Sequence, residues 1–265
     1  MIGTVLEGIV AQTKKDVARR EESRPLSAFD AALMPSQRDF RSALVAGRDN
    51  TVEGWPALIS EFKPKSPSRG PIRPGALPSD IVPTYENYAS AVSVLCDGPY
   101  FGGGYPVLAE ARAHTERPII AKDFVVCEYQ IAEAREAGAD AILLMATVLD
   151  DDDLERLEAY ARGLQMNALV EVHDREELTR VLDHGYDIIG VNSRDLKTLK
   201  IHRAHMCELL ALVPPGAVRV AESGVDTFDD VSRVVGLADA VLIGSTLMAV
   251  ESPAAKIEEL GWRRA

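Results

Sequence analysis

Short apolar runs alternate with amphipathic segments along most of the chain. Eight runs rich in aliphatic and β-branched residues occupy positions 57–62, 90–95, 118–123, 141–145, 167–172, 187–192, 218–223 and 240–245. Segments with apolar residues at helical spacing lie between several of them, at 129–138, 152–163, 174–185 and 229–236, and each of these ends in glycine. Eight strands alternating with helices predict an α/β protein with a parallel (β/α)8 barrel, the TIM barrel. A doubly wound open sheet is the alternative, but its strand count is usually lower and its glycine-rich dinucleotide loop is missing.

The first 55 residues follow a different pattern. Residues 4–22 place Val5, Ile9 and Val17 near helical spacing, and residues 38–47 indicate a second short helix. This region has too few apolar residues to form a core of its own. We therefore expect residues 1–55 to form a helical extension packed on a barrel of residues 56–265, so that the chain is a single domain.

Composition and charge narrow the classes of partner. The formal charge is −12, so we expect neither nucleic acid nor an anionic membrane surface as a partner. The three cysteines lack metal-ligand spacing, and the chain has neither a signal-peptide pattern nor a membrane-spanning apolar run. We expect a cytoplasmic protein that is a monomer, with a weak homo-oligomer as the alternative.

Polar side chains end five of the predicted strands. The stretch 58–70, LISEFKPKSPSRG, carries Glu61 and Lys63 two positions apart before a loop rich in proline, serine and cations. Residues two apart share a face of a strand. The same parity recurs at Ile120 and Lys122, Leu169 and Glu171, Gly190 and Asn192, and Val220 and Glu222. Each polar group could simply mark where its strand emerges into water, but five at matching depth favour a site at the C-terminal ends of the strands.

Glycines follow the last two predicted strands, in ESG at 222–224 and IGS at 243–245. The loops after strands seven and eight of such barrels commonly bind phosphate through backbone N–H groups. Gly224 and Gly244 would let the backbone approach an anion, and Ser245 would add a hydroxyl donor. A plain tight turn explains either motif alone, whereas the two together favour a phosphate site.

Two further features receive structural interpretations. The acidic run at 150–153 is expected to supply an N-cap and favourable charge at the start of the next helix. The five histidines, His114, His173, His184, His202 and His205, show no metal-ligand spacing, and we interpret them as surface or loop residues.

Taken together, these segments closely resemble the indole-3-glycerol phosphate synthase family of tryptophan biosynthesis. The resemblance rests on EFKPKSPSRG (61–70), KDF (122–124), the strand that carries Glu171, GVNSRDL (190–196), ESG (222–224) and IGS (243–245). It extends across nearly the whole chain, including the helical extension. One departure follows Phe101, where the family usually has a polar residue, glycine and serine, and this chain has three glycines at 102–104. We expect that loop to lose side-chain contacts and to gain flexibility.

The resemblance implies conversion of 1-(2-carboxyphenylamino)-1-deoxyribulose 5-phosphate into indole-3-glycerol phosphate, carbon dioxide and water, with no cofactor and no metal. By matching position, Lys122 would be the general acid for ring closure and Glu171 would take part in acid–base steps. Lys63, partnered by Glu61, would contact substrate anions and donate the proton for dehydration. The remaining implied residues are catalytic Asn192, the substrate contacts Ser66, Pro67, Phe101, Leu143, Arg194, Glu222 and Ser223, and the phosphate contacts Lys63, Gly224, Gly244 and Ser245.

The chemistry of the residues agrees with this implied reaction. Ring closure turns a carbonyl oxygen into a hydroxyl, so a positioned ammonium stabilises the developing charge and supplies the proton. One competing interpretation is another phosphate-binding barrel enzyme of the pathway, such as an isomerase with a cysteine and an aspartate. Cys96 and Cys127 do not lie where the first strand would supply that cysteine. The other is a non-catalytic barrel that binds a phosphorylated ligand, which would not need proton donors at three strand ends.

Overall fold

The computed structural model describes residues 5–51, 54–195 and 198–263. Residues 1–4 and 52–53 of the predicted extension, Leu196 in the motif at 190–196, and residues 197, 264 and 265 lie outside the described residues.

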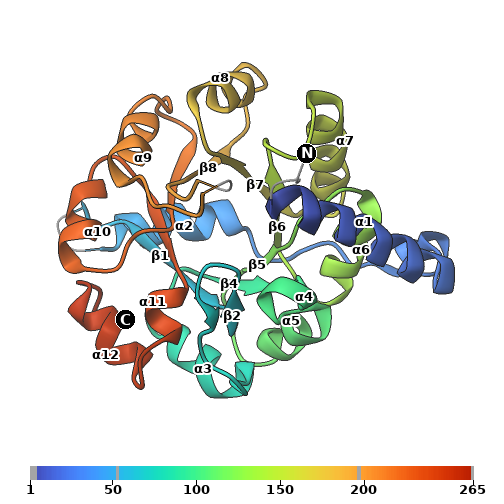
Figure 1. The fold of residues 1–265 in the computed structure, drawn as a ribbon, viewed down its shortest axis with the longest axis horizontal. Helices are drawn as coiled ribbons and strands as arrows, with labels where there is room; N and C mark the ends of the chain where they lie inside the picture. The colour runs from blue at the N-terminus through green and yellow to red at the C-terminus, as the bar shows by residue number, and fades with distance from the viewer. Residues whose placement is uncertain (1–4, 52–53, 196–197, 264–265) are drawn as a thin grey trace.

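Eight parallel strands in the described part of the chain close into a barrel (Figure 1). They are β1 (Ala57–Phe62), β4 (Ala91–Leu95), β5 (Ile119–Lys122), β6 (Ala141–Met145), β7 (Asn167–Val172), β8 (Ile188–Asn192), β9 (Val218–Glu222) and β10 (Ala240–Ile243). Each pairs with the next in chain order, and β1 pairs with β10 from Ala57 and Ala240 onward to complete the circle. The predicted TIM barrel is therefore confirmed, and every barrel strand lies inside its predicted run.

Helices surround the barrel (Figure 1). They are α3 (Pro78–Tyr85), α4 (Gly98–Phe101), α5 (Tyr105–Arg112), α6 (Glu128–Glu136), α7 (Asp151–Gly163), α8 (Arg175–Asp183), α9 (Arg203–Leu210), α10 (Phe228–Val234), α11 (Ser245–Met248) and α12 (Pro253–Glu259). Side-chain caps fix several of their starts. The acidic run acts as predicted, because Asp150 caps α7 by accepting from the Asp153 N–H at 2.9 Å.

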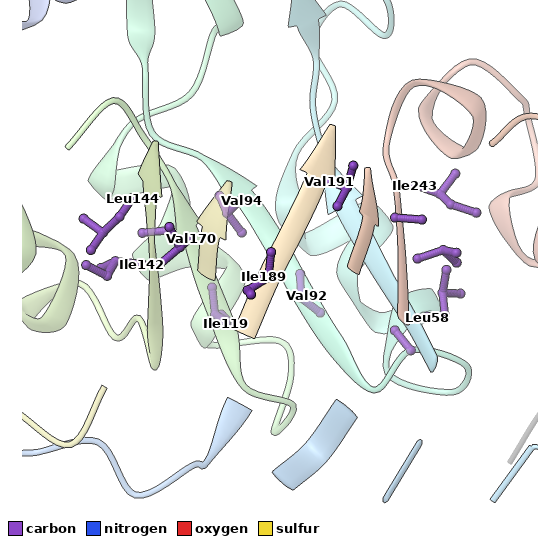
Figure 2. Close-up of a cluster of buried hydrophobic side chains, with 14 of the residues drawn as sticks. Leu58, Val92, Val94, Ile119, Ile142, Leu144, Val170, Ile189, Val191 and Ile243 are labelled. Carbon is purple, nitrogen blue, oxygen red and sulfur yellow. The ribbon is translucent and has the colours of Figure 1, made fainter. Parts of the chain in front are cut away.

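Side chains inside the barrel and outside it form separate apolar layers. Ile59, Ile120, Leu169 and Val220 belong to the inner layer, which confirms the predicted parity of their strands. Phe40 joins this layer from outside the barrel strands. The outer layer packs the strands against the surrounding helices. Figure 2 shows part of that outer layer, with Leu58, Val92, Val94, Ile119, Ile142, Leu144, Val170, Ile189, Val191 and Ile243 labelled.

Before β1 the chain forms α1 (Val5–Ser23), the short 3-10 turns η1 (Leu26–Ala28) and η2 (Asp30–Ala32), and α2 (Phe40–Asp49). Helix α1 is held on α6 by Arg20, whose Nε lies 2.9 Å from Glu133 Oε1. Val17 and Phe29 pack on Tyr129 of the same helix. The expected helices of the extension are present, and the domain boundary at residue 55 stays a prediction.

The predicted loop after β1 contains a small hairpin. Strands β2 (Lys65–Ser66) and β3 (Gly70–Pro71) pair antiparallel. The Ile72 N–H donates to the Pro64 carbonyl at 2.8 Å, which closes the base of the hairpin. Within the described ranges, every helix is too short or too polar to cross a lipid bilayer.

Candidate active site

The C-terminal ends of the barrel strands surround one cavity of about 140 Å³, which continues into a neighbouring groove of about 340 Å³. Lys63, Arg194 and Ser223 line both spaces. The predicted residues that line the cavity are Glu61, Lys63, Ser66, Pro67, Phe101, Lys122, Leu143, Glu171, Asn192, Arg194, Glu222, Ser223 and Ser245. Gly224 and Gly244 line the groove. The structure thus brings every predicted site residue to one mouth of the barrel.

Lys122 lies at the centre of the charged groups. Its Nζ is 2.7 Å from Glu171 Oε2 on β7 and 2.5 Å from Glu222 Oε2 on β9. Both carboxylates are almost completely buried. Among the described residues, Glu222 Oε1 has no hydrogen-bond partner. Buried charges need partners of this kind, so the ammonium and the two carboxyl groups form one interdependent unit.

These contacts shift the pKa of each group. Burial by itself would lower the pKa of Lys122, but Glu171, Glu222 and Glu61 outweigh it and raise that pKa. Burial would raise the pKa of Glu171, yet the Lys122 ammonium and His173 bring it down to about 2. Burial raises the pKa of Glu222 to about 8, because the Glu171 carboxylate adds to it and Lys122 only partly compensates. The shifts thus favour the ammonium form of Lys122 and the carboxylate form of Glu171, and burial shifts Glu222 toward its protonated form.

A second ion pair lies at the C-terminal end of β1. Glu61 of β1 is buried and pairs with Lys63, the residue that follows the strand. Ser93 on β4 donates a hydrogen bond to the other Glu61 oxygen at 3.2 Å. Both oxygens of Glu61 thus have a partner, and the Glu61 carboxylate orients the Lys63 ammonium.

Asn192 and Arg194 extend the site from the end of β8. The Arg194 N–H donates to Asn192 Oδ1 at 3.0 Å, and Arg194 Nη1 donates to the Leu199 carbonyl at 3.0 Å. Burial lowers the pKa of the Arg194 guanidinium, and neighbouring Arg69 adds to this effect. Two cations near each other at the edge of the groove favour an anionic ligand there.

The groove also has backbone features suited to phosphate. Ser223 and Gly224 both have positive φ, at 63° and 70°. Such a turn can present successive N–H groups to an anion. Helix α11 begins at Ser245, which also lines the groove, and the first N–H groups of a helix have no partner within it. Arg69 and Thr246 also line the groove, and neither was predicted from the sequence.

The opposite side of the cavity is apolar. The rings of Phe101 and Phe124 lie 6.0 Å apart at a tilted angle, and Leu143 of β6 completes this wall. Val5, Leu6 and Ile9 of α1 also line the cavity. Sequence reasoning missed these three, because their helical pattern indicates a buried face without saying what that face covers. An apolar wall beside a charged centre suits an aromatic ring.

The family model of indole-3-glycerol phosphate synthase matches residues 6–260. The chain belongs to the indole-3-glycerol phosphate synthase family. An indole-3-glycerol phosphate synthase from Albidiferax ferrireducens is 40% identical over 260 residues, covering 97% of each chain. Another, from Variovorax paradoxus, is 40% identical over 258 residues, covering 94% of this chain and 96% of that one. Among solved structures, a thiamine phosphate pyrophosphorylase from Pyrococcus furiosus matches with a TM-score of 0.58 at 16% identity, covering 83% of this chain and 95% of that one. That likeness shows the fold alone.

One of the five histidines, His173, lies in the loop between β7 and α8, which agrees with the expectation of a surface or loop position. Its side chain is nevertheless mostly buried, at 12% exposed, and its Nε2 lies 3.3 Å from Glu171 Oε1. A signal for this contact was present, since residues 171 and 173 have the parity that joins Glu61 to Lys63. Metal-ligand spacing alone does not detect a histidine that pairs with a carboxylate.

The glycines at 102–104, where the chain departs from the pattern of the indole-3-glycerol phosphate synthase family, pack against the end of β4. A Cβ atom on Gly103 would lie 1.8 Å from the Leu95 carbonyl oxygen. The Gly103 N–H donates to the Asp97 carbonyl at 2.9 Å, and the Gly104 N–H donates to the Leu95 carbonyl at 3.1 Å. Backbone hydrogen bonds therefore hold this loop in the absence of side chains. The expected gain in flexibility stays a prediction.

Proposed function

We propose that the chain catalyses the reaction of its family, the conversion of 1-(2-carboxyphenylamino)-1-deoxyribulose 5-phosphate into indole-3-glycerol phosphate, carbon dioxide and water. One observation supports this most directly. The Lys122 ammonium lies between Glu171 and Glu222 inside a cavity that has an apolar wall and opens onto a cationic groove. An aromatic ring, a reacting carbonyl and a phosphate each have a matching region in that arrangement.

The substrate is proposed to lie across both spaces. Its phosphate binds in the groove between the turn at Ser223 and Gly224 and the start of α11, with Lys63 and Arg194 supplying charge. Its carboxyphenyl ring lies against Phe101 and Leu143, with Ser66 and Pro67 on the side of the hairpin. This orientation brings the ribulose carbonyl to the middle of the cavity, next to Lys122.

Ring closure is the first proposed step. The ring carbon that bears the carboxylate attacks the ketone carbon, and Lys122 gives its proton to the ketone oxygen, which becomes a hydroxyl. The bond to the carboxylate then breaks, carbon dioxide leaves, and its electron pair restores the aromatic ring. The Glu171 carboxylate keeps Lys122 charged before the step, so the proton is available for transfer.

Dehydration completes the indole. The new hydroxyl leaves as water after it accepts a proton from Lys63, and the neighbouring carbon that bears the nitrogen loses a proton to Glu171. Glu61 orients Lys63 for this transfer. Asn192, Arg194 and Glu222 hold the intermediate between the two steps. These roles need proton transfer only, which two ammonium groups and two carboxyl groups supply.

The remaining proposals concern partners and location. The formal charge of −12 supports a small phosphorylated substrate held by a local group of cations, with no nucleic acid or membrane surface as a partner. A monomer in the cytoplasm is the state proposed.

The direct test is to incubate the purified protein with the carboxyphenylamino substrate and to follow indole absorbance and fluorescence. Product formation that is lost in the Lys122→Met variant is the expected result. A folded wild-type protein that binds the substrate without forming indole would instead support a non-catalytic binding barrel.

A further inference from the structure

The Glu171 carboxylate has two different neighbours. Its Oε2 faces Lys122 Nζ at 2.7 Å, and its Oε1 faces His173 Nε2 at 3.3 Å. His173 is the residue immediately after β7, two positions beyond Glu171, so continuing the alternation of the strand carries its side chain to the same face. In the described part of the chain, His173 Nε2 has no hydrogen-bond partner, so the contact with Glu171 is one of charge.

The other side of the imidazole is fixed by Glu177 of α8 and by Thr147. His173 Nδ1 lies 3.0 Å from Thr147 Oγ1 and 3.6 Å from Glu177 Oε2. The Thr147 hydroxyl donates to Glu177 Oε1 at 2.7 Å, and the backbone N–H of His173 donates to Glu177 Oε2 at 2.7 Å. Glu177 is thereby anchored at both oxygens, and it holds the imidazole in place.

This arrangement determines the protonation of the ring. Because the Thr147 hydroxyl proton is directed to Glu177, its oxygen is left to accept from Nδ1, which must then carry a proton. Nε2 faces a carboxylate and gains from carrying a proton as well. The ring is therefore held as an imidazolium between an anion on β7 and an anion on α8.

We infer that His173 is a positioning residue for the reaction proposed above: its imidazolium holds Glu171 Oε1, keeps Glu171 ionised and leaves Oε2 directed at Lys122. The inference rests on the proposed function, since it concerns the acid–base role of Glu171. His173 does not line the cavity as described, so it acts through Glu171 and not on the substrate.

Electrostatics agree with the geometry. Burial would lower the pKa of His173, but Glu177, Glu171 and Glu222 outweigh it and raise that pKa. The positive charge of His173 also lowers the pKa of Glu171, and its effect is second to that of Lys122. Removing the charge of His173 should raise the pKa of Glu171. The Glu171 carboxylate, which acts as a base in the proposed reaction, would then remain protonated up to a higher pH.

A merely structural role is the alternative, in which His173 only ties β7 to α8. The two roles differ in what His173→Asn changes. Asparagine keeps a polar group that can reach Thr147 and Glu177, so a structural tie would leave kcat and its pH dependence as they are. A positioning role predicts a kcat about tenfold to a hundredfold lower, a KM nearly unchanged, and an acidic limb of the kcat profile moved to higher pH.

The matched control is His184→Asn, at the other end of α8, where His184 pairs with Asp151 at 3.6 Å. It should leave kcat, KM and the pH profile unchanged. A second measurement does not depend on turnover: NMR titration of the histidine ring protons in the wild type and in Glu171→Gln, with the His173 signal assigned by its loss in His173→Asn. The expected result is a lower His173 pKa in Glu171→Gln.

Two results would overturn the inference: a His173 signal that titrates identically in the wild type and Glu171→Gln, or a folded His173→Asn variant with unchanged kcat and acidic limb. A wild-type protein that forms no indole would instead overturn the proposed function. In that case the NMR titration would still decide whether His173 and Glu171 are paired.

Discussion

Gly190 on β8 lies so close to Glu222 on β9 that a Cβ atom at position 190 would come within 2.1 Å of Glu222 Oε1. The same relationship recurs on the neighbouring strands, where a Cβ on Gly244, just after β10, would lie 2.2 Å from Glu61 Oε1 on β1. Each glycine leaves space for a buried carboxylate that in turn orients a lysine. Gly244 was predicted as a phosphate contact, and the structure adds this second reason for its lack of a side chain.

Gly190→Ala should therefore damage activity more than stability. The added methyl displaces Glu222, which contacts Lys122 at 2.5 Å, so we expect kcat to fall by about tenfold to a hundredfold. Gly163→Ala is the matched control, because a Cβ there meets nothing within 4 Å. Steady-state kinetics and thermal unfolding of both variants test this. A Gly190→Ala variant with wild-type kcat would mean that Glu222 can move without consequence.

Lys122→Met should lower the rate of ring closure by about a hundredfold to ten-thousandfold, since it removes a positioned general acid. It also leaves Glu171 buried without its cation, which costs about 3–5 kcal/mol of stability at neutral pH. The double variant Lys122→Met, Glu171→Gln should regain stability without regaining activity. Single-turnover kinetics and urea unfolding separate the two effects. Near wild-type turnover in a folded Lys122→Met variant would contradict the proposed role.

Glu171→Gln should lower kcat far more than it raises KM, because the amide keeps the size of the side chain but cannot exchange a proton. We expect about a hundredfold loss in kcat. Initial-rate kinetics across substrate concentration give both constants. An increase in KM with unchanged kcat would make Glu171 a binding residue instead.

Glu222→Gln should change how stability depends on pH. The pKa of Glu222 is raised to about 8 in the folded protein, whereas in the unfolded chain it is about 4.3. Its contribution to stability is full below the unfolded value and is lost as pH rises toward 8, because ionising a buried carboxyl opposes folding. Glutamine has no such loss. The free energy of unfolding of Glu222→Gln, relative to wild type, should therefore increase from pH 5 to pH 8. Urea unfolding at several pH values measures it, with exposed Glu155→Gln as the control.

The strands and their parity could be predicted because they depend on local sequence. Apolar runs mark the barrel strands, and alternation places Glu61, Lys122, Glu171 and Glu222 on the inner face. The barrel, the family and the convergence of the polar strand ends follow from that information. The roles of the site residues and the boundary at residue 55 stay predictions.

What the sequence did not reveal depends on how distant elements pack. The apolar face of α1 is visible in the sequence, but its position over the cavity is set by contacts such as Arg20 with Glu133 of α6. The space beside Gly190 and the contact of His173 with Glu177 are likewise products of neighbouring strands and helices. None of these relationships has a local sequence signal strong enough to be found alone.

The hairpin after β1 gives the last prediction. Ser66 and Pro67 line the cavity, so the segment 64–70 forms part of the wall that a bound substrate would contact. Two of its polar contacts with neighbouring parts of the protein are exposed. Lys65 Nζ donates to the Pro99 carbonyl at 2.9 Å, and Arg69 Nη2 lies 3.9 Å from Asp226 Oδ1. An exposed ion pair of this kind contributes about 0–1 kcal/mol, which a small opening can overcome.

We therefore predict that the hairpin opens in the free protein and becomes ordered over the ligand, as βα loops that cover anionic substrates do. Pro64 and Pro67 limit the conformations of the open form, which reduces the entropic cost of closing. Hydrogen exchange across residues 62–72 should slow when indole-3-glycerol phosphate is added, while exchange in α12 stays constant as an internal control. Arg69→Ala should speed exchange in the free protein and weaken the protection by ligand. Equal exchange with and without saturating product would instead show that the hairpin is a rigid wall of the cavity.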